Sequence, residues 1–248
     1  MSVPTQAREE LSLRVKGHQV HVRVEGVGEP LLLINGLTRP VDSWDLFVAA
    51  LGERTVISFD APGVGDSPAP FLPLSIVQLA DLAAAVLSTL GVDNADVLGY
   101  SHGGAVAQQF AESHAERLRR LILVATSCGV GSTLPVSDPR DSVALVVRGM
   151  VKANALSTLW RTVAFSTWSS IPFLGAIDAP TLIVCGRDDN VTPAANSRLL
   201  AGRIPDATLI ELPEGHDLQQ PGAAERLAQV VETFLEREPN RVSEHPTL

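Results

Sequence analysis

The feature that most constrains the fold of this chain is a regular alternation of continuous apolar runs with segments of helical spacing. The helical segments include residues 43–51, 74–91 and 102–118, and the clearest of them, 74–91, ends at Gly91. Apolar runs without polar alternation are typical of strands buried on both faces of a parallel sheet. The order strand, helix, strand predicts an α/β fold with right-handed crossovers and helices on both faces of the sheet. The apolar runs occupy residues 30–36, 55–60, 95–100, 120–126, 180–186 and 207–212.

Two further runs, at residues 11–17 and 18–26, alternate apolar and polar side chains and meet at Gly17. Strict alternation is typical of half-buried strands, and a glycine between two such runs favours an antiparallel pair. We expect this pair to form one edge of the sheet. With the six apolar runs, it predicts a mostly parallel sheet of about eight strands.

Composition limits what such a chain can bind. Its 248 residues, of which 45% are hydrophobic, are enough for one sizeable core. A formal net charge of -9 argues against a nucleic-acid partner, because phosphate contacts require a basic surface. The first ten residues, MSVPTQAREE, are polar, and no apolar run approaches the roughly 20 residues that span a bilayer. We therefore expect a soluble cytoplasmic protein without a membrane span, and the sequence is silent on oligomeric state.

The alternation is interrupted between residues 127 and 176, which predicts an inserted lid over the body of the domain. The body then comprises residues 1–126 and 177–240, and residues 241–248 form a flexible tail. Several aromatic residues gather in the lid, and we take Trp160 and Trp168 as candidate substrate-binding residues. Packing of the lid onto the body explains the same aromatics equally well.

The stretch VLGYSHGG places Ser101 between a buried strand and a helix. In this setting a G-x-S-x-G motif forms a sharp turn that exposes the serine. A sharp turn with small neighbours lifts the hydroxyl above the carboxyl edge of the sheet, where open α/β sheets bind ligands. The helix that follows directs backbone N–H groups toward the same place. Ser101 is therefore a candidate nucleophile.

A serine nucleophile needs a base, and the base needs a group that orients it. His216 is the only histidine that follows a late predicted strand, so it is the candidate base. The loop after residues 180–186 offers Asp188 and Asp189 as the orienting acid, and the residues alone do not separate the two. We expect the side chain of His102, next to Ser101 and at the start of the helix, to point away from the nucleophile.

Backbone donors for an oxyanion come from two loops. The residue after the nucleophile supplies one through the N–H of His102, and the loop NGLTRP supplies the second through Leu37. In this loop Asn35 and Gly36 shape the turn, and Asn35 and Thr38 are further candidate substrate-binding residues.

No part of the sequence predicts a metal or a cofactor. His18 and His21 lie three apart on an expected strand, so their side chains point to opposite faces. The loop DAPGVGDSP at residues 60–68 lacks the lysine and the spacing of a P-loop, and a tight turn is the simpler interpretation.

With Ser101, Asp189 and His216 in that chain order, the sequence resembles the α/β-hydrolase superfamily over nearly its whole length. The resemblance favours Asp189 over Asp188, because Asp189 stands fourth from Gly186. Within the superfamily, stretches such as SHGGAVAQQFAESHAERLRRLILVAT and WSSIPFLGAI are most similar to intracellular poly(3-hydroxyalkanoate) depolymerases.

The resemblance implies a serine hydrolase that cleaves carboxylic esters through an acyl-enzyme, without a cofactor. Medium-chain hydroxyalkanoate esters or oligomers are the implied substrates. Carbon–carbon bond hydrolases, perhydrolases and ligand receptors that do not catalyse a reaction also occur on this scaffold, and they are the alternatives.

Overall fold

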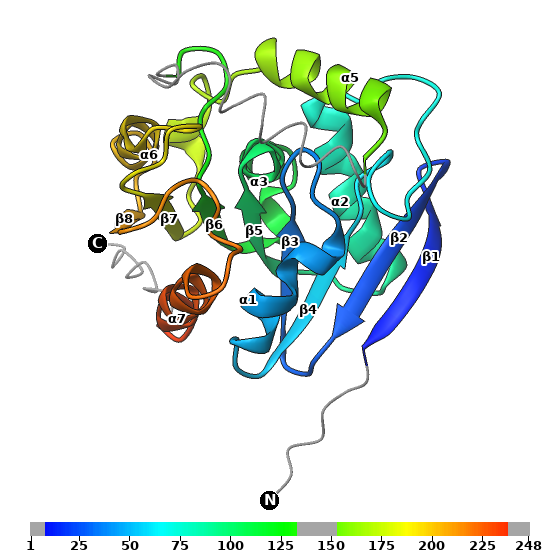
Figure 1. Ribbon diagram of the computed structural model, residues 1–248, viewed down its shortest axis with the longest axis horizontal. Coiled ribbons are helices and arrows are strands. Elements are labelled where there is room, and N and C mark those ends of the chain that lie inside the picture. Colours follow the sequence, from blue (N-terminus) through cyan, green and yellow to red (C-terminus); the bar gives the residue numbers. More distant parts are fainter. Residues whose placement is uncertain (1–7, 133–152, 238–248) are drawn as a thin grey trace, which may run out of the picture.

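A computed structural model describes residues 8–132 and 153–237 and contains a single eight-stranded sheet (Figure 1). The strand order is β1-β2-β4-β3-β5-β6-β7-β8. The β1–β2 and β2–β4 pairs are antiparallel, and all pairs from β4 to β8 are parallel. The predicted edge pair and mostly parallel sheet are confirmed. The strands are β1 (Glu9–Val15), β2 (His18–Glu25), β3 (Glu29–Ile34), β4 (Arg54–Phe59), β5 (Ala95–Tyr100), β6 (Leu118–Val124), β7 (Thr181–Gly186) and β8 (Ala207–Leu212).

Helices cover both faces of the sheet, and each face has its own core. Buried side chains of α2, α3 and α6 pack on one face, and those of α1 and α7 pack on the other. Both β5 and β7 are buried along their whole length, which explains why their sequences show no polar alternation. The helices are α1 (Asp45–Ala49), α2 (Ile76–Thr89), α3 (His102–Ser113), α5 (Ala155–Ser166), α6 (Ala194–Ala201) and α7 (Ala223–Leu235).

Two helices are shorter than their sequence patterns predict. The helical spacing near residues 43–51 becomes a 3-10 turn, Val41–Trp44, followed by the short α1. The pattern after Ser101 continues to residue 118, yet α3 ends at Ser113. The chain has to reverse there to begin β6, and a 3-10 turn makes the reversal. Arg117 holds this turn against the end of α2 by donating to the carbonyls of Ala84 and Val92.

The segment between β6 and β7 contains α5 and a 3-10 turn, Leu174–Ala176. Two glutamines of α3 bind it to the body. Gln109 accepts a hydrogen bond from the indole of Trp168 at 2.8 Å, and Gln108 accepts one from Ser170 at 2.6 Å. These two hydrogen bonds hold the chain that follows α5 against α3. Part of the predicted lid, residues 133–152, and the predicted tail, residues 241–248, lie outside the described residues.

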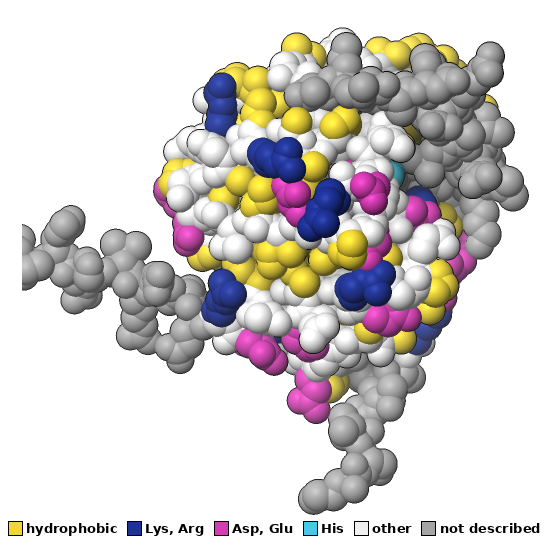
Figure 2. Space-filling view, turned by 60° about the vertical axis from the view of Figure 1, so that its left-hand side comes forward, with side chains coloured by type: hydrophobic (Ala, Val, Ile, Leu, Met, Phe, Trp, Pro, Cys, Tyr) yellow, Lys and Arg dark blue, Asp and Glu magenta, His cyan; other side chains and the backbone are white. Residues whose placement is uncertain are grey.

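Figure 2 shows the face formed by α6, β8 and α7, where acidic, basic and apolar side chains are interspersed. The edge strand β8 lies on this side, and Arg198 of α6 pairs with Glu211 of the strand at 2.8 Å. Charged side chains are typical of sheet edges, because they discourage pairing with another strand. In the described part of the chain, no helix has both the length and the apolar character needed to cross a membrane.

Candidate active site

Ser101 occupies the sharp turn between β5 and α3, and its backbone is strained. Its φ of 53° and ψ of −119° are values that residues other than glycine rarely adopt, at a cost of about 1–3 kcal/mol. The turn also requires close packing of the first helical turn, since a Cβ at Gly103 would lie 2.1 Å from the carbonyl oxygen of Ile34. The glycine lets α3 begin directly against the end of β3, which fixes where the serine hydroxyl stands.

His216 reaches Ser101 from the loop after β8. Its Nε2 atom lies 3.1 Å from the serine Oγ, although the two residues are 115 positions apart in sequence. Tyr100, the last residue of β5, holds the backbone of this loop because its hydroxyl donates to the His216 carbonyl at 2.8 Å. The imidazole is buried, with 8% of its residue surface exposed. It is therefore placed to receive a proton from the serine hydroxyl.

Of the two aspartates that the sequence left open, Asp189 is the one beside His216. Its Oδ2 lies 2.8 Å from the histidine Nδ1, and its Oδ1 accepts hydrogen bonds from the backbone N–H groups of Val191 and Thr192. These two backbone bonds fix the rotation of the carboxylate. Asp188 is exposed, and its backbone N–H donates to the carbonyl of Glu214. The geometry joins Ser101, His216 and Asp189 in one hydrogen-bonded chain.

The loop after β3 runs alongside Ser101. A Cβ at Gly36 would lie 3.6 Å from the Cβ of the serine, so the loop approaches the nucleophile closely. Asn35 shapes the loop by donating to the carbonyl of Pro40 and accepting from the N–H of Gly36. Leu37 follows in a turn that is closed by the Arg39 N–H and the Gly36 carbonyl.

His102 is the first residue of α3. Its backbone N–H therefore has no acceptor within the helix, as is true of all first-turn N–H groups. The helix directs this donor and its positive dipole end toward the nucleophile turn. The start of α3 and the loop after β3 therefore both border Ser101.

Arg39 links the loop after β3 to the loop that carries His216. Its guanidinium donates to Asp217 at 2.5 Å and to Gln219 at 3.0 Å, and Gln219 in turn donates to Asn35 at 3.1 Å. The guanidinium also lies over the ring of Tyr100. Burial alone would raise the pKa of Asp217, but the hydrogen bond and charge of Arg39, together with hydrogen bonds from Gln220 and the Gln219 backbone, lower that pKa. No pattern in the sequence predicted this link.

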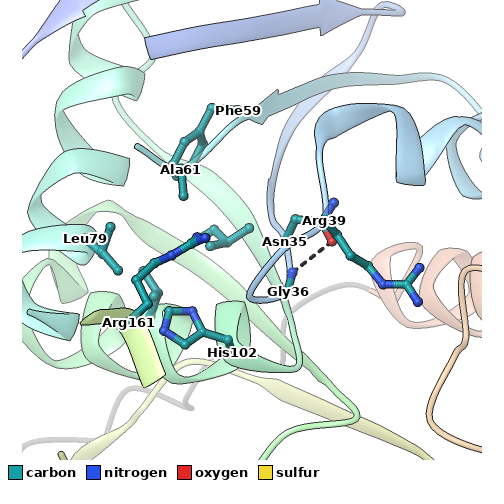
Figure 3. Close-up of a pocket in the computed structure, with 10 residues that line it drawn as sticks. Asn35, Gly36, Arg39, Phe59, Ala61, Leu79, His102 and Arg161 are labelled. Carbon is teal, nitrogen blue, oxygen red and sulfur yellow. Dashed lines mark hydrogen bonds between the residues drawn. The ribbon is translucent and has the colours of Figure 1, made fainter. Parts of the chain in front are cut away.

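A narrow cavity lies beneath α5, beside the start of α3 (Figure 3). Its wall includes Asn35 and Gly36 from the loop after β3, and the imidazole of His102 from α3. The His102 side chain was expected to point away from the nucleophile, and the structure places it in this cavity next to Arg161. Burial lowers the pKa of His102 to about 3, and the charge of Arg161 acts in the same direction. The imidazole is therefore neutral at physiological pH.

The other candidate substrate-binding residues lie in different surroundings. Thr38 is buried in the loop after β3. Trp168 packs against Phe165, and its indole N–H is bound by Gln109, so it joins the lid segment to the body. Trp160 is more than one-third exposed, and it lines a neighbouring cavity that also contains Arg161.

One cluster within the described residues has the donor types of a metal site. Side-chain atoms of His21, Asp60 and Asp66 lie within 4.8 Å of one another. However, the carboxylate of Asp60 already accepts hydrogen bonds from the backbone N–H groups of Val41 and Asp66. The bond from Asp66 closes the loop at residues 60–68, which was predicted to be a tight turn, and the bond from Val41 joins this loop to the one after β3. The arrangement favours a structural role for Asp60.

Comparison with known proteins decides the family. Residues 29–148 and 148–223 match the family described as the alpha/beta hydrolase fold. The chain belongs to this family. A poly(3-hydroxyalkanoate) depolymerase from Ectopseudomonas oleovorans is 33% identical over 249 residues, which cover 88% of each chain. The predicted α/β-hydrolase fold and the predicted similarity to depolymerases are confirmed.

Other α/β-hydrolase relatives act on different substrates. A 2-hydroxy-6-oxo-6-phenylhexa-2,4-dienoate hydrolase from Burkholderia cepacia is 27% identical, with 80% of this chain and 85% of the relative covered. Among solved structures, an esterase from Exiguobacterium antarcticum superposes with a TM-score of 0.82 at 18% identity, over 92% of this chain and 100% of that one. Membership of the family identifies a hydrolase, and its curated relatives are named for different substrates.

Proposed function

We propose that this α/β-hydrolase is a serine esterase that cleaves carboxylic esters through an acyl-enzyme. The observation that carries the proposal is the hydrogen-bonded chain in which His216 contacts Ser101 at 3.1 Å and Asp189 at 2.8 Å. A nucleophile, a base and an orienting acid in this order are the parts that acyl transfer by serine requires. The strained turn at Ser101 supports the proposal, because strain of this kind clusters at functional sites.

In the first half of the reaction, His216 takes the proton of Ser101 while Oγ attacks the ester carbonyl. The developing oxyanion receives hydrogen bonds from the backbone N–H groups of Leu37 and His102. His216 then gives its proton to the alkoxide, which leaves as the free alcohol. The product of this half is an ester between Ser101 and the acyl group of the substrate.

In the second half, a water molecule takes the place of the alcohol. His216 removes a proton from the water, the hydroxide attacks the acyl-enzyme, and the same two N–H groups hold the oxyanion. Collapse of this intermediate returns the proton to Ser101 and releases the carboxylic acid. Throughout, Asp189 keeps the Nδ1 proton of His216 in place and stabilises the imidazolium.

Similarity to the depolymerase extends the proposal to the substrate. A relative of 33% identity aligns with 88% of this chain and with 88% of its own length. We therefore propose medium-chain hydroxyalkanoate esters or oligomers as substrates. The chain has His102 directly after the nucleophile, and this side chain lines the cavity, so it contributes to the shape of the acyl site.

Hydrolysis of p-nitrophenyl esters from acetyl to dodecanoyl tests the ester proposal, with Ser101→Ala measured beside the wild type. We expect a maximum at medium chain length, and we expect the variant to lose about 10⁴- to 10⁶-fold in kcat. Circular dichroism checks that the variant is folded. Turnover that is the same in both proteins would show that Ser101 is not the nucleophile.

Carbon–carbon bond hydrolysis is the second candidate, and the similarity to the dienoate hydrolase from Burkholderia cepacia favours it. Such an enzyme would hydrolyse a vinylogous diketone faster than any ester. Measuring both substrate types with the same preparation decides between the two. Serine-dependent turnover of the diketone alone would replace the ester proposal.

A further inference from the structure

The helix α5 is inverted relative to an ordinary surface helix. Surface helices bury an apolar stripe and expose a polar one. In α5 the buried side chains are Ser157, Thr158 and Arg161. The exposed face instead carries apolar side chains, namely Leu156, Leu159, Trp160 and Val163. The fully buried residues of α5 are therefore all polar, although Phe165 at its end packs against the apolar core.

Arg161 is the charged member of this inner face, and only 3% of its surface is exposed. Its Nε and Nη2 atoms are buried and have no hydrogen-bond partner within the described structure. Burial lowers the pKa of Arg161 to about 10, so the guanidinium still carries its charge at neutral pH. A buried charge without a partner is strongly unfavourable, and buried arginines are normally paired.

The unpartnered guanidinium points into the cavity beside the start of α3. Figure 3 shows it between Leu79 and His102, directed toward the loop that carries Asn35 and Gly36. That loop and His102 border the nucleophile Ser101. None of the residues that line this cavity is acidic. Two arginines line the cavity. Arg39 is paired with Asp217, whereas Arg161 has donors without a partner among the described residues, and no acidic residue in the cavity wall balances its charge.

We propose that Arg161 binds a free carboxylate of the substrate and makes the enzyme selective for esters that carry one. This inference rests on the proposed ester hydrolysis and defines its substrate class more closely. A carboxylate matches the planar fork of a guanidinium and can accept two parallel hydrogen bonds. The binding would satisfy the donors that the protein leaves unpaired.

The carboxylate can come from either side of the ester bond. On the acyl side, the substrate is a half-ester of a dicarboxylic acid. On the alcohol side, the leaving group is a hydroxy acid, as at the free-acid end of a hydroxyalkanoate oligomer. In both cases the same group binds to Arg161. Two pairs of substrates show on which side of the ester bond the carboxylate lies.

The first pair tests the acyl side with the p-nitrophenyl monoester of glutarate and its terminal amide. The second pair tests the alcohol side with 3-(butanoyloxy)butanoate and its amide. The two members of each pair have nearly the same shape and differ in charge. We expect wild type to prefer the carboxylate in one pair, measured as the kcat/KM of the carboxylate divided by that of the amide. We expect Arg161→Met to lower this ratio about 10- to 100-fold. Arg161→Lys keeps the charge without the fork and should give an intermediate ratio.

Arg198→Met is the matched control, since Arg198 is an exposed arginine of α6 that pairs with Glu211. It should leave both ratios unchanged. A purely structural arginine would lower the melting temperature when replaced, whereas removal of an unpaired buried charge should keep or raise it. Unchanged ratios in Arg161→Met for both pairs would overturn the proposal, and so would a loss of several degrees in Tm without a change in ratio.

A binding measurement separates this inference from the ester proposal. In the Ser101→Ala background no ester is hydrolysed, so calorimetry with butanoate and butanamide reports recognition alone. We expect butanoate to bind and butanamide not to bind, and we expect Arg161→Met to abolish the difference. Equal binding of the two probes refutes the role of Arg161 even if esters are hydrolysed. Failure of wild type to hydrolyse any ester refutes the ester proposal even if butanoate binds.

Discussion

Replacement of Asp189 by asparagine exchanges one oxygen of the site for an NH₂ group. In the wild type, Oδ1 accepts from the backbone N–H groups of Val191 and Thr192 at 2.8 and 2.7 Å, and Oδ2 faces the Nδ1 of His216 at 2.8 Å. An asparagine that keeps its oxygen on the two backbone donors must turn its NH₂ toward Nδ1. Nδ1 then has to accept a hydrogen bond, and the imidazole proton moves to Nε2. This is the wrong tautomer, because Nε2 can no longer take the proton of Ser101.

The opposite orientation of the asparagine restores the tautomer but is costly. It turns the NH₂ group toward two buried N–H groups and leaves them without an acceptor. At about 1–3 kcal/mol for each unsatisfied group, the penalty is about 2–6 kcal/mol. The competent form is thus depleted by roughly 30-fold to 10⁴-fold, at 1.4 kcal/mol for each factor of ten. With the added loss of the negative charge that stabilises the imidazolium, we expect kcat to fall about 10⁴-fold.

Asp188→Asn is the control for this variant, since the neighbouring carboxylate is exposed and its side chain lies outside the hydrogen-bonded chain. Steady-state hydrolysis of a p-nitrophenyl ester, measured for both variants and the wild type, gives the comparison. Asp188→Asn should keep wild-type kcat within a factor of two or so. The reasoning is refuted if Asp189→Asn loses less than tenfold, or if the two variants lose activity to the same extent.

Two predictions concern stability. Because burial holds the pKa of His102 near 3, the imidazole is neutral in the folded state while the unfolded chain binds a proton below its ordinary value of 6.5. The free energy of unfolding of the wild type therefore falls as the pH is lowered from 6.5 toward 3. His102→Gln lacks this loss, so its free energy of unfolding in urea should gain about 2 kcal/mol relative to wild type between pH 7 and pH 5. A difference between the two proteins that does not change with pH would contradict this. In Gly103→Ala the new Cβ meets the Ile34 carbonyl at 2.1 Å, so the free energy of unfolding should fall by about 3 kcal/mol. In Gly91→Ala the new Cβ meets no atom within 4 Å, and only the φ of 72° is unfavourable, so the free energy of unfolding should fall by only about 1 kcal/mol. Equal losses in the two variants would rule out the packing argument.

Much of the fold could be predicted from the sequence because the sheet signals are local. The runs that became β5 and β7 are buried on both faces, and their mainly apolar sequences without polar alternation indicate this burial. The end of α3 was missed because residues 114–118 keep a helical composition. The break there comes from the reversal of the chain into β6 and from the contacts of Arg117 with α2, which are tertiary effects.

The candidate site was predictable where strand ends determine it. Ser101, Asp189 and His216 each follow a strand, and parallel strands bring their carboxyl ends to one edge. The link from Arg39 to Asp217 could not be predicted, because it joins two loops that are far apart in sequence. Arg161 was missed for a different reason. Most apolar residues of α5 are exposed, which is the reverse of what helical periodicity predicts for a surface helix.

The buried position of Arg161 on α5 changes the free-energy cost of binding a carboxylate. A guanidinium on an open surface must lose its water when a carboxylate arrives, and this cost cancels much of the attraction. Arg161 has lost that water during folding, and its donors are already directed into the cavity. When a substrate carboxylate binds, the only dehydration cost is therefore that of the carboxylate itself. The guanidinium is already in place, in the same way that fixed dipoles stabilise charge without rearrangement. Burial of the Arg161 charge destabilises the folded protein, and this cost is not incurred again when a substrate binds. The enzyme therefore binds an anionic substrate more tightly than a neutral one.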